Sequence, residues 1–333
     1  MRVPSIADTA RTWLALAAAT SALAVAVSVS VSVSVSASVS APASEPAYQL
    51  AVLPTGFTAA ARRGRQFQIY ELAASGAHLD EYAVTANADA RVVGSPGGPL
   101  IAQISRGRFE LLHARSGELV ASFANASRMC DTPAASNDVR YGVAYLASDD
   151  NNVHVVHGET SRPATASDDE LAAPARRPKS WCGVASAGRD LVLLWRTGDR
   201  LYFNACNDRS CRGPVTSIRL PASDKLLGAG CTERAGCLIA TRDGGTGAQQ
   251  LVLVTPAGGV KWRHPLDARA DTISIVGAGD RAFAVGAPGS AFGIDRDGTL
   301  MPLWTGDAEP VVAASRGRVL VAHGHTFTTV SYP

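Results

Sequence analysis

Short apolar runs alternate with short polar turns along most of the chain. A clear instance is Gln249–Trp262, in which the apolar run Gln249–Val254 is followed by a glycine turn and a second run that ends on an aromatic residue. Apolar runs of this length with turn residues between them predict β-strands. Helical periodicity is scarce after residue 27, so the pattern favours an all-β fold.

Related units of strand, turn and strand recur at regular distances. Three further copies are clear, over Arg65–Gly76, Arg108–Gly117 and Ser290–Gly298. Each ends on a glycine, which suits a hairpin turn because such turns need a residue at positive φ. Two weaker copies place this glycine at Gly158 and Gly213. The six turn glycines, which lie between 39 and 55 residues apart, are Gly76, Gly117, Gly158, Gly213, Gly259 and Gly298.

A period of roughly 40–50 residues with four short strands per unit is typical of a β-propeller. One unit contains four consecutive predicted strands, at Thr272–Gly277, Arg281–Gly286, Ala291–Asp295 and Thr299–Trp304. Six marked units and a final one over Pro310–Tyr332 predict seven four-stranded blades. Two packed β-sandwiches are the alternative, since they also consist of short strands with frequent turns.

The last unit has only three predicted strands, at Val311–Ser315, Arg318–His323 and Thr326–Ser331. A ring of blades must avoid an open sheet edge, because such an edge pairs with other chains. We therefore expect that the segment just before Tyr48, or Tyr48–Leu53 itself, pairs into the last blade.

The N-terminal residues predict export from the cytoplasm. Arg2 and Arg11 precede the apolar stretch Trp13–Val27, as in a secretory signal. The small residues of Ala41–Ala43 form a cleavage site, and Ala22–Ala24 is an earlier candidate. We therefore assign residues 1–43 to a signal peptide with a Ser/Val low-complexity segment and residues 44–333 to the propeller. An uncleaved membrane anchor is the alternative, since residues 12–43 carry no charge.

This assignment predicts a protein that is secreted, periplasmic or on the cell surface. Composition agrees with a folded soluble domain, with 46% hydrophobic and 18% charged residues. The 31 basic and 29 acidic residues nearly balance, and no basic run occurs, so nucleic acid is not an expected partner.

Six cysteines in a chain with an export signal favour disulfides over a metal site. Two pairs each close a predicted hairpin, where facing positions bring the Cβ atoms within about 4.5 Å. The remaining two cysteines open the inner strands of neighbouring units. The expected disulfides are Cys130–Cys182, Cys206–Cys211 and Cys231–Cys237. A zinc site built from these thiolates is the alternative, although no C-x-x-C motif occurs.

Other candidate groups all have a plain structural explanation beside the chemical one. Two histidine pairs and two acidic turns could bind a metal, but surface turns have the same composition. A long segment rich in proline and charge is either a surface loop or a rim loop that contacts a ligand. These candidates are His154 with His157, His323 with His325, Asp149–Asn152, Asp295–Gly298 and Ser161–Ser180.

No local catalytic motif is present in the sequence, such as G-x-S-x-G, HExxH, a carboxylate pair or a phosphate-binding glycine loop. We therefore name no catalytic residue and expect neither a metal nor a cofactor. Four tryptophans are expected to pack between blades, with a sugar-stacking role at the rim as the alternative: Trp181, Trp195, Trp262 and Trp304.

Val254–Trp262 and His113–Val120 resemble the repeats of PQQ-like propellers, which run strand, polar turn, glycine, strand and tryptophan. The hairpin between Cys206 and Cys211 resembles hairpins of secreted sialidase-like propellers. These resemblances imply the propeller fold. The quinoprotein dehydrogenases carry two adjacent cysteines at the cofactor, and this chain has none. The sialidase Asp-box is not matched either, because Asp297 is followed directly by Gly298.

The expected function is that of a secreted, monomeric, non-catalytic propeller that binds a protein or a glycan at one face of the ring. The alternative is an extracellular hydrolase or lyase with carboxylates or histidines lining the central channel. A cluster of charged groups at the channel mouth would favour the enzyme, and an apolar or mixed mouth would favour binding.

Overall fold

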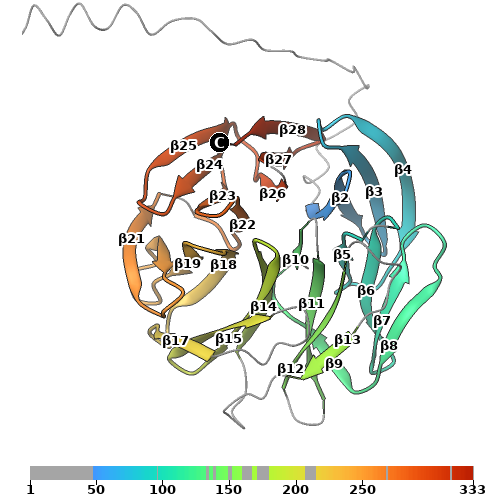
Figure 1. Cartoon of the computed structure of the whole chain (residues 1–333), viewed down its shortest axis with the longest axis horizontal. Coiled ribbons are helices and arrows are strands. Elements are labelled where there is room, and N and C mark those ends of the chain that lie inside the picture. The colour runs from blue at the N-terminus through green and yellow to red at the C-terminus, as the bar shows by residue number, and fades with distance from the viewer. Residues whose placement is uncertain are drawn as a thin grey trace, which may run out of the picture. The chain divides into compact units, whose positions relative to one another are not determined.

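The computed structural model describes residues 48–332 except for 96, 133–134, 138–139, 149–151, 160–166, 171–179, 207–214, 268 and 316. Within these residues, 28 strands form seven antiparallel sheets, arranged as blades around a central axis (Figure 1). The fold is therefore all-β, and the predicted seven-bladed β-propeller is confirmed. No helix of the described chain is long and apolar enough to cross a membrane.

The strands follow one another from the axis of the ring outwards in each blade. Blade 1 contains β1 (Tyr48–Leu53), β2 (Gly56–Arg63), β3 (Gln66–Ala73) and β4 (His78–Thr85). Blade 2 contains β5 (Arg91–Val93), β6 (Leu100–Ser105), β7 (Arg108–His113) and β8 (Leu119–Phe123). Blade 3 contains β9 (Ala126–Met129), β10 (Ala135–Ser136), β11 (Arg140–Ala147), β12 (Val153–Glu159) and β13 (Ser167–Glu170).

The remaining blades repeat this order. Blade 4 contains β14 (Trp181–Ala187), β15 (Asp190–Thr197), β16 (Arg200–Cys206) and β17 (Val215–Arg219). Blade 5 contains β18 (Lys225–Thr232), β19 (Gly236–Arg242), β20 (Gln249–Val254) and β21 (Val260–Leu266). Blade 6 contains β22 (Ser274–Ala278), β23 (Ala282–Ala287), β24 (Ser290–Asp295) and β25 (Leu300–Thr305). Blade 7 contains β26 (Val311–Ser315), β27 (Arg318–His323) and β28 (Thr326–Ser331).

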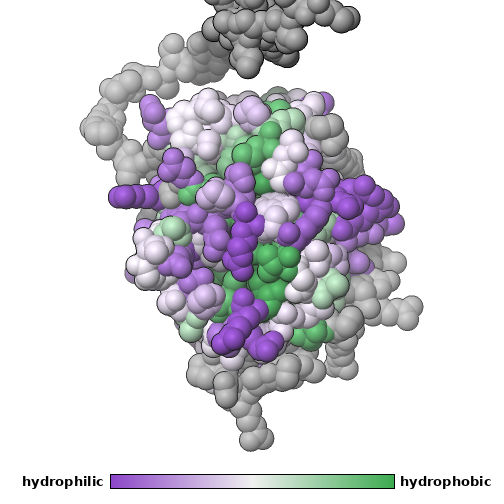
Figure 2. Space-filling model, turned by 90° about the vertical axis from the view of Figure 1, so that its left-hand side faces the viewer, coloured by the Kyte–Doolittle hydropathy of each residue, from purple (hydrophilic) through white to green (hydrophobic). Residues whose placement is uncertain are grey.

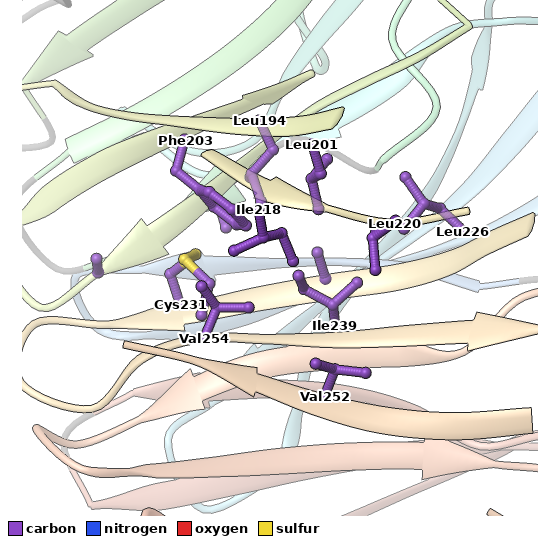
Figure 3. Close-up of a cluster of buried hydrophobic side chains, with 14 residues drawn as sticks. Leu194, Leu201, Phe203, Ile218, Leu220, Leu226, Cys231, Ile239, Val252 and Val254 are labelled. Carbon is purple, nitrogen blue, oxygen red and sulfur yellow. A yellow bond between two sulfur atoms is a disulfide. The ribbon is translucent and has the colours of Figure 1, made fainter. Parts of the chain in front are cut away.

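Apolar clusters between neighbouring blades form the core. One of them joins Leu194 and Phe203 of blade 4 to Ile239 and Val252 of blade 5 (Figure 3). Trp195 belongs to such a cluster, and Trp181, Trp262 and Trp304 pack against others, as predicted. Burial of apolar area stabilises the fold by about 25 cal/mol per Å², so each blade is stabilised by packing against its neighbours.

The outermost strands alternate between partly buried and exposed side chains. In β21, Val260 is 42% exposed, and in β25, Leu300 is 46% exposed. Figure 2 shows this outer surface on the side of the ring that holds β21 and β25, where hydrophilic residues surround smaller apolar patches. The alternation follows from the two-residue period of a strand with one face on the core and one on solvent.

The innermost strands of blades 5 and 6 approach each other closely enough to require glycine. A Cβ atom on Gly230 of β18 would lie 2.7 Å from the carbonyl oxygen of Ile275 in β22. Gly228 and Gly277 have even less room: their Cβ atoms would lie 2.0 Å from the carbonyl oxygens of Ile273 and Cys231 respectively. The two backbones therefore touch directly at this seam.

Side chains tie other pairs of inner strands together. Gln49 of β1 accepts a hydrogen bond from Val92 N (2.9 Å) and donates one to Ala90 O (3.1 Å) in blade 2. Ser274 of β22 accepts one from Val312 N of β26 (3.1 Å). Each side chain thus satisfies backbone groups that the blade's own sheet leaves unpaired.

An arginine near the end of the second strand plays a similar part in blades 1, 4 and 5. Arg196 is 5% exposed and donates to the carbonyl oxygens of Gly198, Pro221 and Asp224. Arg62 donates to Gly64 O (3.2 Å) and Asn87 O (2.6 Å), and Arg242 donates to Ala270 O. These guanidinium groups hold the segment that leads to the next blade in place.

The predicted closure of the ring was wrong for Tyr48–Leu53. This segment is β1, which pairs with β2 in blade 1, whereas the described part of blade 7 has three strands. The short hairpin is favoured because its two strands are adjacent in the chain, so closing the loop costs little entropy. The segment before Tyr48 lies outside the described residues, as do the predicted signal peptide and its cleavage site.

Blades 7 and 1 meet through aromatic side chains. Tyr48 donates a hydrogen bond from its hydroxyl to Gly324 O (2.9 Å), and its ring lies 5.5 Å from that of Phe327. Tyr70 contacts Phe327 as well, at 5.3 Å between ring centroids. Thr329 adds a hydrogen bond to Ser75 O (2.7 Å).

Two turn glycines differ from the prediction. Gly158 lies inside β12, opposite Tyr141, where a Cβ atom would overlap the tyrosine ring, so packing rather than a turn requires glycine there. In blade 5, Gly258 has the positive φ (85°) rather than the predicted Gly259. Gly213 lies outside the described residues. The strands of blade 7 match the prediction residue for residue.

Candidate functional site

The central channel is lined by the inner strands of blades 1, 3, 4, 5, 6 and 7 and has a volume of about 260 Å³. Blade 2 does not contribute, because β10 of blade 3 lies beside β1. There the backbone N–H of Val52 donates to Ser136 Oγ (2.7 Å). Most lining side chains are small or aliphatic, among them Val52, Val184, Ala229, Ile275 and Val312.

Polar groups in the channel are engaged in holding the inner strands together. Asp131 is the one charged residue among the described lining residues, and its Oδ2 accepts a hydrogen bond from Cys182 N (3.0 Å). Thr132 Oγ1 accepts one from Val184 N (2.9 Å). The described lining of the channel is therefore mostly apolar, with a few polar groups.

Two of the three predicted disulfides are present. Cys130 follows β9, where the inner strand of blade 3 is interrupted, and joins Cys182 of β14 in blade 4. Cys231 and Cys237 face each other across β18 and β19. Cys211 lies outside the described residues, so its predicted pairing with Cys206 stays a prediction.

A second recess, of about 520 Å³, lies between blades 1 and 2. Its walls come from the turns β1–β2, β5–β6 and β7–β8 and from the neighbouring parts of β3 and β4. Antiparallel strands alternate in direction, so turns between the first and second strands and between the third and fourth strands emerge on one side of the ring. We call this side the hairpin face and the recess the blade 1–2 cleft.

Four charged or hydroxyl side chains form one network at the cleft. The Tyr82 hydroxyl donates to Glu71 Oε1 (3.0 Å), and Arg115 Nη2 donates to the same oxygen (3.1 Å) and to Asp80 Oδ2. The guanidinium group of Arg115 also lies over the Tyr82 ring, 4.7 Å from its centroid. The network therefore fixes a carboxylate and a guanidinium group side by side.

Burial and hydrogen bonds shift the pKa values of Tyr82, Arg115 and Asp80 in the network. Burial, followed by the hydrogen bond to Glu71, raises the pKa of Tyr82 above its usual value near 10. Hydrogen bonds to Asp80 and Glu71 raise the pKa of Arg115, and the hydrogen bond from Arg115 lowers the pKa of Asp80. At neutral pH the network thus holds two carboxylates, one guanidinium group and a neutral phenol.

The β7–β8 turn presents Arg115 at its tip. His113 N donates to Glu118 O (2.9 Å), and Gly117 N donates back to His113 O (2.8 Å). Gly117 adopts a positive φ of 69°, which closes the turn. His113, Arg115 and Glu118 all line the cleft. The repeat unit seen in the sequence therefore positions three of the cleft's polar residues.

The candidates singled out from the sequence lie elsewhere. His154 stacks on Tyr145 (5.1 Å) and His323 on Trp304 (4.4 Å). Asp295 accepts hydrogen bonds from the backbone of its own turn, as a plain turn residue does. Asp149–Asn151 and most of Ser161–Ser180 lie outside the described residues. Among the residues that are described, no group of three or more His, Cys, Asp or Glu could hold a metal ion.

Sequence reasoning missed Glu71, Tyr82 and Arg115 as members of one site. They come from β3, β4 and a turn of the next blade, so no short motif contains them. The turn arginine was no distinguishing signal: blade 1 has Ala74 and blade 5 has Pro256 at this position, but blade 6 also has an arginine there, Arg296.

Comparison with known proteins supports the fold. No family model matches the chain, and no curated protein matches it. The WD40 domain of Toxoplasma gondii coronin is similar in structure, with a TM-score of 0.54 and 14% identity over 85% of this chain and 80% of that one. Streptogramin B lyase has a TM-score of 0.51 and 15% identity over 87% and 94%.

BBS1N, in complex with ARL6DN, is also similar, with a TM-score of 0.52 and 11% identity over 84% of this chain and 88% of that one. All these identities are too low to carry function from one protein to another. The likeness thus confirms the expected resemblance to propellers at the level of the fold.

Proposed function

We propose that the chain is a secreted, non-catalytic propeller that binds a protein or a glycan through the hairpin face. The blade 1–2 cleft is the observation that carries this proposal. It lies on one face of the ring, has the volume of a small-molecule site, and gathers an ordered set of polar side chains. Propellers commonly bind partners with the loops of one face, where side chains can vary without disturbing the blades.

The channel gives the enzymatic alternative less support. Its described lining offers one carboxylate, Asp131, which is already bonded to the backbone of blade 4. The similar proteins include both a lyase and BBS1N in complex with ARL6DN, so the fold is compatible with either role. A mostly apolar channel lining favours a binding protein over an enzyme with charged groups in the channel.

Two buried disulfides support export, because such bonds persist in oxidising compartments. We propose that the protein acts as a monomer outside the cytoplasm.

The test uses the full chain on a printed array of glycans and on a printed array of extracellular proteins. Ser116 is an exposed residue that lines the cleft, and Arg65 is exposed on the opposite face, in the β2–β3 turn. We expect Ser116→Trp to lower binding to the positive spots at least tenfold, and Arg65→Trp to leave it unchanged. Failure to bind any spot, or an equal loss in both variants, would refute the proposal.

A further inference from the structure

We infer that the ligand of the blade 1–2 cleft is a neutral sugar, bound through neighbouring hydroxyl groups. This inference rests on the proposed binding function and names its ligand class.

The cleft holds a carboxylate beside a guanidinium group. Adjacent sugar hydroxyls each donate and accept, so a carboxylate can accept from one while a guanidinium group donates to the next. Glu71 bonds its described neighbours through Oε1, and Arg115 bonds them through Nη2. Glu71 Oε2 and Arg115 Nε and Nη1 therefore have bonding capacity left for a ligand.

The cleft carries an excess of negative charge. The cleft and its network hold three carboxylates, from Glu71, Asp80 and Glu118, against the single guanidinium group of Arg115. An anionic ligand would meet this excess of negative charge, and the guanidinium group is already neutralised by two carboxylates. A simple cation would suit the carboxylates but would offer no acceptor to Nε and Nη1 of Arg115. A neutral ligand with both donors and acceptors satisfies both groups.

The walls and the volume of the cleft suit a sugar ring. Leu53, Pro54 and Pro99 give the cleft apolar wall segments suited to the C–H faces of a sugar ring. Gly97 and Gly98 carry no side chain into it, and Gly98 has a φ of 104° that other residues rarely adopt. A volume of about 520 Å³ lies inside the range of small-molecule sites.

The polar side chains of the cleft are held in place before a ligand binds. Tyr82 and Arg115 already hold the Glu71 carboxylate, whose side chain is 21% exposed. A ligand would therefore order few further side chains, which lowers the entropic cost of binding.

The test is isothermal titration calorimetry of the full chain. The neutral probes are cellotriose, maltotriose, mannotriose and chitotriose, and the acidic probes are trigalacturonate and 3′-sialyllactose. We expect at least one neutral trisaccharide to bind, and to bind more tightly than either acidic probe. Arg115→Ala and Glu71→Gln should each weaken this binding at least about tenfold, because each removes a charged hydrogen-bond partner.

The fold supplies a matched control. Arg296 lies two residues before the turn glycine Gly298 of blade 6, as Arg115 lies two residues before Gly117. Arg296→Ala should bind the trisaccharide as the parent chain does, and its backbone oxygen still accepts from Lys261 and Trp262. Far-UV circular dichroism and melting temperatures check that all three variants are folded.

The outcomes separate the ligand class from the proposed function. If no neutral trisaccharide binds while a protein on the array binds in a manner that Ser116→Trp abolishes, the function stands and the sugar inference is overturned. Tighter binding of an acidic probe overturns the inference too. An equal loss with Arg115→Ala and Arg296→Ala would place the sugar elsewhere on the ring and overturn it as well.

Discussion

The disulfide between Cys130 and Cys182 should contribute more to stability than the one between Cys231 and Cys237. The first closes a loop of 52 residues between two blades, and the second closes a loop of 6 residues inside one blade. A cross-link restricts the unfolded chain more when the loop is longer. Loop length rather than local environment should therefore separate the two bonds.

The loop lengths set how much each disulfide contributes to the free energy of unfolding. In the chain-entropy description, a loop of 52 residues corresponds to about 4 kcal/mol at 25 °C and a loop of 6 residues to about 2 kcal/mol. All four cysteines are less than 9% exposed, so replacing either pair by alanine removes similar buried sulfur atoms. The difference between the two double variants, about 2 kcal/mol, therefore reports the difference in loop length.

The assay is equilibrium unfolding in urea, followed by tryptophan fluorescence, on the parent chain, C130A/C182A and C231A/C237A. Refolding from high urea must retrace each curve before free energies are compared. We expect the midpoint to fall further for C130A/C182A. If C231A/C237A loses as much stability as C130A/C182A, or more, the loop-length reasoning is refuted.

Three further outcomes are expected. Arg196→Met should lower the free energy of unfolding by about 3–5 kcal/mol, measured in urea, because three carbonyl oxygens lose a buried charged donor; loss of under 1 kcal/mol would contradict this. Gly230→Ala should cost about 1–3 kcal/mol by overpacking at the seam of blades 5 and 6, whereas Gly259→Ala should be near neutral, because its Cβ atom would meet only Thr255 Oγ1, at 3.4 Å. Because Arg115 lowers the pKa of Asp80, this ion pair stabilises the fold above the unfolded pKa near 4, and its contribution is lost as the pH falls through the lower folded value. The melting temperatures of the parent chain and Arg115→Ala should therefore converge between pH 5 and pH 2, and a constant gap would argue against the pair.

Local patterns predicted most of the fold. The strands of blade 7 and the Cys231–Cys237 disulfide follow from short apolar runs joined by tight turns, in which partners lie close together in the chain. The Cys130–Cys182 disulfide spans 52 residues and follows from the repeat, which makes the inner strands of blades 3 and 4 neighbours. The error at Gly158 arises where a tertiary contact decides. Gly158 is a glycine because Tyr141 packs on it from the neighbouring strand, and a single sequence does not show that contact.

The cleft could not be predicted for the same reason. Glu71, Tyr82 and Arg115 meet only because blades 1 and 2 are neighbours in the ring and because the β7–β8 turn leans over β3 and β4. The repeat predicted six similar turns, but their similarity gives no indication of which one carries a site. That information lies in the residues that differ between copies.

The contact between Tyr48 and Gly324 has a consequence for how the protein is made. The two residues are 276 positions apart in the chain. Synthesis proceeds from the N-terminus, so blade 1 must wait for the last strands before its neighbour exists. During that interval, the apolar side of blade 1 that receives Phe327 stays uncovered. A chain that stops before β27 and β28 would keep it uncovered permanently, and would expose it to aggregation or to chaperones.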